Sequence, residues 1–270
     1  MICLKRTPGF GQWRSSQSLH NVMQDRRAKT IGIIPARLAS TRLLHKPLLD
    51  IAGKSLVQRS WEQALQARLL DKVVVAVDDE RVFKEVTSFG GEAMMTSVEC
   101  QTGTDRVAEA ARHFPEAEVI VNVQGDQPLV PPQAIDEVAK AMQENPEIEI
   151  SNLVAKASRE DAENPSVVKI VQDRQGFALY CSRSPIPYPR NEEFCSWYKI
   201  MDVYGFRPAA LQKIAALPPT SLEKAESVEQ LRILEHGYKI KLVETPCDFI
   251  GVNTPEDLEK VRALLSHGES

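Results

Sequence analysis

The sequence has few of the residues that build disulfide scaffolds or zinc sites. Its 270 residues include five cysteines and five histidines. No two cysteines have CxxC spacing, and no two histidines have HxH or HxxxH spacing, which disfavours a disulfide framework and a zinc hydrolase. Unpaired cysteines fit a reducing compartment such as the cytoplasm. A magnesium site, which needs only one or two carboxylates, stays compatible with this composition. The cysteines are Cys3, Cys100, Cys181, Cys195 and Cys247.

Long apolar runs and a basic body are also missing. No apolar run approaches the ~18 residues of a membrane span, so we expect no membrane partner. Residues 1–29 contain six lysines and arginines against Asp25 alone, and they carry +5 of a net charge of −4. The rest of the chain therefore carries −9. An acidic body disfavours nucleic acid as a partner, because phosphates require a basic face.

The basic segment 1–29 is predicted to lie outside the folded domain. It lacks the apolar core of a secretory signal. Its arginine- and serine-bearing, nearly acid-free composition is typical of an organellar transit peptide. We favour a disordered tail, or a chain that begins at Met23, because the segment has no clear amphipathic period. The folded domain is expected over 30–265, with a short tail at 266–270.

From Thr30 onward, short β-branched runs alternate with helical stretches, which is typical of an α/β fold. Strands are predicted at 31–34, 72–77, near 94 and at 119–123, and the first of them ends at Pro35. Helices are predicted from Ser55, over 79–89, from about 104 and over 131–144. Continuous apolar runs suit a mostly parallel sheet covered by helices on both faces. Strands at 149–157, 166–172, 177–182 and 198–207 predict a smaller mixed β/α subregion over about 150–237. The turn 173–176 joins two of these strands as a hairpin, and a strand at 239–243 and a helix capped by Thr254 end the chain.

Two segments follow predicted strands at the edge where open α/β sheets bind ligands. The first, Ala36–Pro47, has three cations and two hydroxyls and no acid: Arg37, Ser40, Thr41, Arg42 and Lys46. Guanidinium and ammonium groups match the oxygens of a di- or triphosphate. A solvated basic loop is the simpler alternative.

The second segment places Asp126 at the end of the apolar run 119–123. A strand end holds a carboxylate rigidly, and Mg²⁺ takes its other ligands from phosphate and water. An Asx turn that caps the strand is the structural alternative. The sequence lacks GxxxxGK[ST] and GxGxxG, which leaves P-loop and dinucleotide-binding sites without support.

Six motifs together resemble the 3-deoxy-manno-octulosonate (Kdo) cytidylyltransferases, the CMP-Kdo synthetases. The similarity covers about residues 30–265. The motifs are Ile33–Arg42 with Lys46-Pro47-Leu48, Gly103–Arg106, Val123–Asp126, Ala178–Arg183, Tyr204–Arg207, and Leu222-Glu223 through Glu229–Arg232.

The resemblance implies a Rossmann-like nucleotidyltransferase that couples CTP to Kdo for lipopolysaccharide biosynthesis, as a cytoplasmic homodimer with Mg²⁺. It places Arg37, Lys46 and Asp126 in catalysis. By position it assigns CTP binding to Ala36, Arg37, Ser40, Arg42, Lys46, Gly103, Thr104, Arg106 and Gln124, sugar binding to Arg183, Tyr204, Glu229 and Gln230, and metal binding to Asp126 and Asn253.

The sequence departs from the family pattern at several site positions. Leu44-His45 replace Pro-Gly, Ile200 replaces histidine, Asp202 replaces glycine, and Gln127 stands where many members have glutamate. Asn253 replaces the aspartate that serves the family as a second magnesium ligand, and the sequence leaves Asp248 and Asp257 open as substitutes. These changes keep two alternatives open: a catalytically impaired paralogue that acts as a nucleotide-binding or regulatory partner, and a cytidylyltransferase for another acidic sugar.

Overall fold

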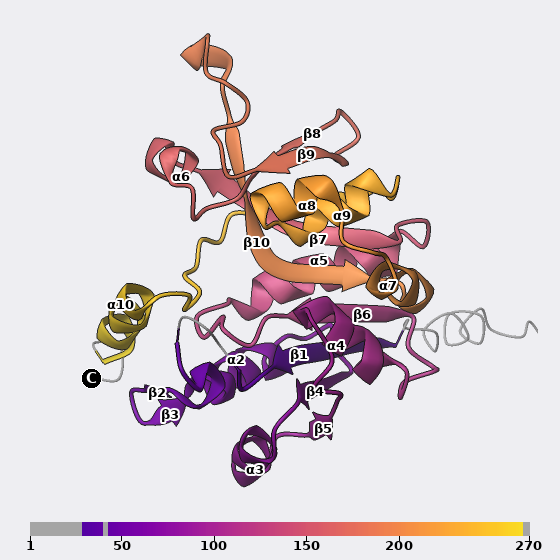
Figure 1. The fold of residues 1–270 in the computed structure, drawn as a ribbon, viewed down its shortest axis with the longest axis vertical. Helices are drawn as coiled ribbons and strands as arrows, with labels where there is room; N and C mark the ends of the chain where they lie inside the picture. Colours follow the sequence, from indigo (N-terminus) through magenta and orange to yellow (C-terminus); the bar gives the residue numbers. More distant parts are fainter. Residues whose placement is uncertain (1–28, 40–42, 267–270) are drawn as a thin grey trace, which may run out of the picture.

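The computed structural model describes residues 29–39 and 43–266 (Figure 1). The strands are β1 (Thr30–Ala36), β2 (Asp50–Ile51), β3 (Lys54–Ser55), β4 (Lys72–Val77), β5 (Ala93–Met95), β6 (Val119–Val123), β7 (Ile150–Ala157), β8 (Lys169–Gln172), β9 (Ala178–Ser182), β10 (Trp197–Phe206) and β11 (Lys241–Thr245). The helices are α2 (Leu56–Leu65), α3 (Glu80–Ser88), α4 (Gly103–Ala111), α5 (Pro132–Glu144), α6 (Arg159–Glu163), α7 (Pro208–Ala215), α8 (Ser221–Glu226), α9 (Glu229–Glu235) and α10 (Pro255–Ser266), with short 3-10 turns η1 (Lys46–Leu48) and η2 (Glu192–Phe194). The predicted α/β class is confirmed.

One nine-stranded sheet runs through the molecule. Seven strands follow the order β11-β7-β10-β6-β1-β4-β5, and β8 and β9 pair beside β10. The pairs β1–β4, β1–β6, β4–β5 and β11–β7 are parallel, whereas β10 is antiparallel to both β6 and β7. The subregion predicted over about 150–237 therefore continues the main sheet, and its boundaries stay a prediction.

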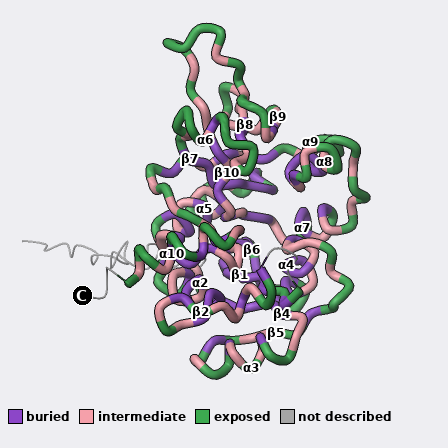
Figure 2. The backbone as a smooth tube through the Cα atoms, turned by 60° about the vertical axis from the view of Figure 1, so that its left-hand side comes forward, coloured by how far each residue is buried: buried purple, intermediate pink, exposed green. Residues whose placement is uncertain are grey.

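Helices cover both faces of the sheet, as the apolar runs predicted. Buried side chains of α2 and α5 pack on one face, with the central residues Val75, Val121 and Val123 fully buried. Helices α4, α7 and α9 pack on the other face around Ile33 and Ile120. Figure 2 shows the resulting buried centre along β1, β4 and β6. This core fixes the strand ends that carry the candidate site.

Most predicted elements have the expected position. Strands 72–77 and 119–123 match β4 and β6, and Ser55 caps α2 by accepting a hydrogen bond from the Gln58 backbone N–H at 3.3 Å. The first strand extends beyond its predicted end and includes Pro35 and Ala36. Its pairing with β6 stops at Ile33, so the missing N–H of Pro35 interrupts no bond on that side.

A projecting arm lies beyond the β8–β9 hairpin. Residues 184–196 lead from β9 to β10, and the arm stands at the top of Figure 1 and is largely exposed in Figure 2. The hairpin prediction is confirmed by the antiparallel pairing of β8 with β9. None of the helices in the described ranges has the length and apolar character to cross a membrane. Of the tails predicted at 1–29 and 266–270, residues 1–28 and 267–270 lie outside the described residues, and Ser266 is the last residue of α10.

Candidate active site

A cleft of about 280 Å³ opens at the ends of β1 and β6. The two strands are adjacent and parallel, so their carboxyl ends lie together, as expected for ligand sites in open α/β sheets. The N-terminus of α4 and the segment before α10 complete the walls. The lining residues are Pro35, Ala36, Arg37, Lys46, Pro47, Gln101, Thr102, Gly103, Arg106, Gln124, Gly125, Asp126 and Asn253.

Gly125 is needed where the two strand ends meet. A Cβ at this position would lie 2.7 Å from the backbone oxygen of Pro35, closer than carbon and oxygen can approach. The Ser60 hydroxyl of α2 donates to the Gly125 carbonyl at 3.1 Å and holds the turn that follows β6. This close approach brings the basic segment after β1 beside Asp126.

Three side chains from distant parts of the sequence meet in the cleft. The Lys46 ammonium donates to Asp126 Oδ2 at 2.6 Å and to Asn253 Oδ1 at 3.2 Å. The pair is sheltered, because the side chains of Lys46 and Asp126 are 17% and 24% exposed. An ammonium has three N–H groups, so Lys46 keeps one donor for a ligand such as a phosphate oxygen.

The second oxygen of Asp126 identifies a place where a cation fits. Asp126 Oδ1 is buried and has no hydrogen-bond partner among the described residues. An unpaired buried carboxylate oxygen is costly, and a hard cation compensates that cost. The amide oxygen of Asn253 is the other candidate ligand in the same cleft. Both predicted metal residues therefore have donor chemistry that suits Mg²⁺.

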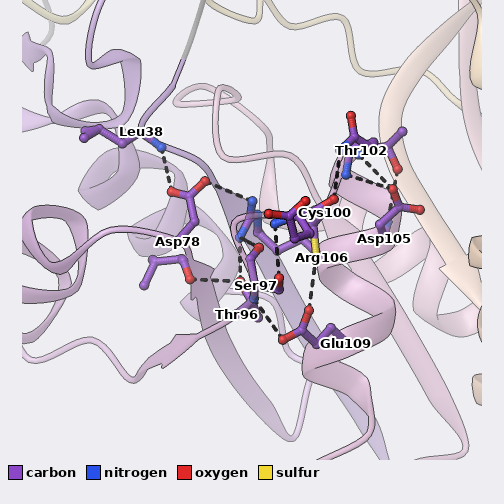
Figure 3. A network of polar contacts seen from close by, with 12 residues as sticks. Leu38, Asp78, Thr96, Ser97, Cys100, Thr102, Asp105, Arg106 and Glu109 are labelled. Carbon is purple, nitrogen blue, oxygen red and sulfur yellow. Dashed lines mark hydrogen bonds and ion pairs between the residues drawn. The ribbon is translucent and has the colours of Figure 1, made fainter.

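The guanidinium of Arg106 braces the cleft from within the protein (Figure 3). Arg106 is 1% exposed and donates to Asp78 Oδ2 at 3.0 Å and to the Thr96 hydroxyl at 2.6 Å. The other oxygen of Asp78 accepts from the Leu38 backbone N–H at 2.9 Å. Asp78 thus connects α4 to the beginning of the basic loop, a role that no motif indicated.

A second, smaller hollow lies beside the first between α4, α9 and β10. Its lining includes Thr104, Asn152, Tyr204, Glu229 and Gln230. Three of the four predicted sugar-binding residues are therefore together. Thr104, predicted to contact the nucleotide, instead lies in this second hollow, where its hydroxyl donates to Glu229 Oε2 at 2.9 Å.

Burial raises the pKa of Glu229 and Tyr204 in this second hollow, and of Asp202 next to it. The pKa of Glu229 is raised by burial. The pKa of Tyr204 is raised well above its usual value by burial and then by the charge of Asp202. The pKa of Asp202 rises to about 6, first because its carboxyl is buried and second because Asp126 carries a like charge nearby.

Arg183 does not lie in either hollow. Its guanidinium donates to three backbone carbonyls, those of Glu226 at 2.6 Å, Pro165 at 2.9 Å and Ser227 at 3.2 Å. The fully buried Lys169 donates to the carbonyl of Arg183 at 2.6 Å and holds the end of β9. The role of Arg183 toward a sugar carboxylate stays a prediction. Ser40 and Arg42 fall outside the described residues.

Comparisons with known proteins show the family of this chain. The cytidylyltransferase family model matches residues 31–240. The 3-deoxy-manno-octulosonate cytidylyltransferases of Geobacter sulfurreducens and Chlorobium chlorochromatii are 48% and 47% identical to this chain, cover 87% of it, and are themselves covered over 98% and 96% of their lengths. The chain belongs to this cytidylyltransferase family.

Solved structures lead to the same fold. A CMP:2-keto-3-deoxy-manno-octonic acid synthetase complexed with CTP is similar with a TM-score of 0.85 at 42% identity, over 89% of this chain and 100% of that one. A 4-diphosphocytidyl-2C-methyl-D-erythritol synthase from Anaerococcus prevotii reaches a TM-score of 0.60 at 15% identity, covering 88% of this chain and 96% of its own. The second likeness shows the fold alone.

The residues that replace the family's Pro-Gly turn have an unusual backbone. His45 adopts the left-handed conformation with φ 52° and ψ 38°, a region that favours glycine. Leu44 before it is 74% exposed. His45 therefore holds a conformation that glycine adopts more easily, and it leads directly into η1 with Lys46.

Neither carboxylate near Asn253 takes the place of the missing aspartate. Asp257 Oδ2 accepts from the backbone N–H groups of Asn253 and Thr254 at 3.0 and 2.9 Å, which caps α10. Asp248 pairs with Lys199 at 2.9 Å. Both carboxylates have other partners and neither lines the cleft, so this arrangement gives no support to a substitute ligand at either position.

Proposed function

We propose that this chain joins CTP to Kdo and forms CMP-Kdo and pyrophosphate. The observation that carries the proposal is the meeting of Arg37, Lys46 and Asp126 in one cleft, from two adjacent strand ends. Cations and a carboxylate in that arrangement suit a metal-bound triphosphate. The relatives named above support cytidine as the base and Kdo as the sugar.

In the reaction, the anomeric hydroxyl of Kdo attacks the α-phosphorus of CTP. A new sugar oxygen–phosphorus bond forms, the bond from the α-phosphorus to the bridging oxygen breaks, the electron pair leaves with pyrophosphate, and the hydroxyl proton passes to solvent. Negative charge grows on the phosphate oxygens, and Lys46 and Arg37 are placed to neutralise it. No covalent enzyme intermediate is required.

Mg²⁺ is the proposed cofactor, with Asp126 Oδ1 and the Asn253 amide oxygen as its protein ligands. When bound, it draws charge from the triphosphate and so favours departure of pyrophosphate. Asp126 holds Lys46 with its other oxygen at 2.6 Å. The Asp126 carboxylate therefore holds the Lys46 ammonium with one oxygen and offers its other oxygen to Mg²⁺. The remaining predicted CTP contacts, from Ala36, Gly103, Arg106 and Gln124, all line the same cleft.

The direct test is pyrophosphate release from CTP and Mg²⁺, with and without Kdo. Kdo-dependent release supports the proposal. The same assay with UTP, ATP and GTP, and with a sialic acid in place of Kdo, decides between this activity and transfer to another acidic sugar. No release under any of these conditions would contradict the proposal and favour the catalytically impaired paralogue.

An Asn253→Asp variant is expected to need about tenfold less Mg²⁺ for half-maximal pyrophosphate release. A second unit charge at ~4 Å is worth about 4 kcal/mol at an effective dielectric constant of about 20, and pairing with Lys46 screens part of it. The measurement is the Mg²⁺ dependence of release at saturating CTP and Kdo. Asn253→Ala, which removes the oxygen, is the matched control and should need more Mg²⁺ than the native chain. An identical dependence in all three would exclude position 253 from the metal site.

We further propose that the chain acts in the cytoplasm, as a homodimer, and supplies lipopolysaccharide assembly. All four cysteines in the described ranges are unpaired, as in a reducing compartment. The projecting arm leaves Tyr188 83% and Phe194 79% exposed, which is costly for an isolated monomer. Light scattering is expected to give twice the mass of one chain, and the mass of a single chain would contradict the dimer.

A further inference from the structure

A hydrogen-bond chain connects the metal end of the cleft to the sugar hollow. Its centre is Asp202, which has no assigned role. Gln127 Nε2 donates to Asp202 Oδ2 at 2.8 Å, and the Tyr204 hydroxyl donates to Asp202 Oδ1 at 3.0 Å. Gln230 Nε2 donates to the Tyr204 oxygen at 3.0 Å and to Asn152 Oδ1 at 3.4 Å. Each link has a defined donor and acceptor.

The sheet fixes the donor-to-acceptor direction of this hydrogen-bond chain at its Asn152 end. Asn152 is fully buried on β7, where the register with β10 shifts between Ile200 and Tyr204. Its amide nitrogen donates to the carbonyls of Met201 at 2.9 Å and Val203 at 3.3 Å. The Asn152 oxygen must therefore accept, and it turns the nitrogen of Gln230 toward itself and toward Tyr204.

The direction is fixed at the near end by Asp202. Its two carboxylate oxygens accept from Gln127 and from Tyr204, so the single hydroxyl proton of Tyr204 is committed to Asp202. Gln127 also donates to Asp202. A glutamate at position 127 would instead place two like charges in contact. Gln127 and Asp202 therefore form a matched pair.

The consequence is that the sugar hollow presents acceptors only. The Tyr204 hydroxyl donates its proton to Asp202, and the two N–H groups of Gln230 donate to Tyr204 and Asn152. Glu229 already accepts from the Thr104 hydroxyl and is engaged by Thr102. What remains for a ligand is the Tyr204 oxygen and the Gln230 amide oxygen. Such a wall suits a polyhydroxylated ligand whose hydroxyls all donate.

We infer that Asp202 is a positioning residue that sets this acceptor-only wall and so selects Kdo by its donor hydroxyls. The inference rests on the proposed function, because it takes the second hollow, with a volume of about 10 Å³, as the part of the sugar subsite that receives a hydroxyl group of Kdo. It assigns Asp202 no contact with CTP. Its loss should therefore weaken the use of Kdo and leave the use of CTP unchanged.

The test is steady-state pyrophosphate release with Kdo and CTP varied separately. Asp202→Leu removes both acceptors at similar volume, and we expect the KM for Kdo to rise about tenfold, the value of one well-placed hydrogen bond, with the KM for CTP within about twofold. Asp202→Asn keeps an acceptor oxygen for Tyr204 and should restore most of the loss. The double variant Asp202→Leu with Tyr204→Phe should have a KM for Kdo no higher than the higher of the two single variants. Both substitutions break the same hydrogen-bond chain, so their effects should not add.

The same strand provides the controls. Tyr198 on β10 donates to Glu244 at 3.2 Å outside both hollows, so Tyr198→Phe and Glu244→Leu should leave both KM values within about twofold. An unchanged KM for Kdo in Asp202→Leu, or an equal rise in both KM values, would overturn the inference. So would an Asp202→Asn variant as impaired as Asp202→Leu. Absence of Kdo-dependent release in the native chain would instead refute the proposed function.

A probe of the native chain keeps the inference testable if Asp202→Leu does not fold. Analogues of Kdo in which one hydroxyl is replaced by fluorine cannot donate a hydrogen bond at that position, whereas amino analogues can. If the wall offers only acceptors, we expect one or more fluoro analogues to have a KM about tenfold higher than Kdo. The amino analogue at the same carbon should have a KM close to that of Kdo. Equal use of all fluoro analogues would contradict the wall.

Discussion

An Asp126→Asn variant is expected to release pyrophosphate from CTP and Kdo about a thousandfold more slowly than the native chain. The amide preserves the shape of the side chain but removes its charge. Asp126 holds Lys46 at 2.6 Å through one oxygen and has a second, buried oxygen free for a cation. Losing that charge costs about 4 kcal/mol at ~4 Å and an effective dielectric constant of about 20, and about 4 kcal/mol is about a thousandfold in rate.

The control for this variant is Asp50→Asn, because Asp50 is exposed on β2 and does not line the cleft. It should keep native activity. Thermal unfolding of Asp126→Asn should stay within a few degrees of the native chain, since the altered side chain is partly exposed. A rate within tenfold of native would show that Asp126 is no more than a turn residue at the end of β6, the structural alternative that its sequence position allowed.

The sheet and the cleft could be predicted because they depend on local patterns. Strands β4 and β6 are continuous apolar runs between polar turns, and their ends mark where ligands bind. The residues of the basic loop and Asp126 follow two of these strands directly. Their meeting therefore required only that the strands be neighbours.

The partners of the site residues could not be predicted in the same way. The carboxylate of Asp78 is 28 positions from Arg106, and nothing in the local pattern connects them. The role of Asp202 could not be predicted, because its donor Gln127 is 75 positions away and reaches it through the pairing of β6 with β10. Long-range hydrogen bonds depend on strand order, which the sequence alone does not contain.

The connection between Asp78 and Arg106 leads to the second large effect. Asp78→Ala is expected to lower the free energy of unfolding by about 3 kcal/mol. Arg106 is 1% exposed, and without Asp78 its charge would stay buried with only neutral partners, the Thr96 hydroxyl and a backbone carbonyl. Breaking one side of a buried ion pair typically costs 3–5 kcal/mol, because the remaining charge is left uncompensated. Urea denaturation measures the change, with Glu80→Ala on exposed α3 surface as the control, expected within about 0.5 kcal/mol.

A double variant separates the lost ion pair from lost packing. If the cost in Asp78→Ala comes from the stranded Arg106 charge, then Asp78→Leu with Arg106→Leu should be more stable than Asp78→Ala alone, because removing both partners leaves no buried charge. If the double variant instead loses the sum of the two single effects, the pair makes no specific contribution. The Leu38 backbone N–H loses its acceptor in every variant at position 78. A loosening of the basic loop, seen as a higher KM for CTP, is therefore expected in Asp78→Ala, where Arg106 is kept.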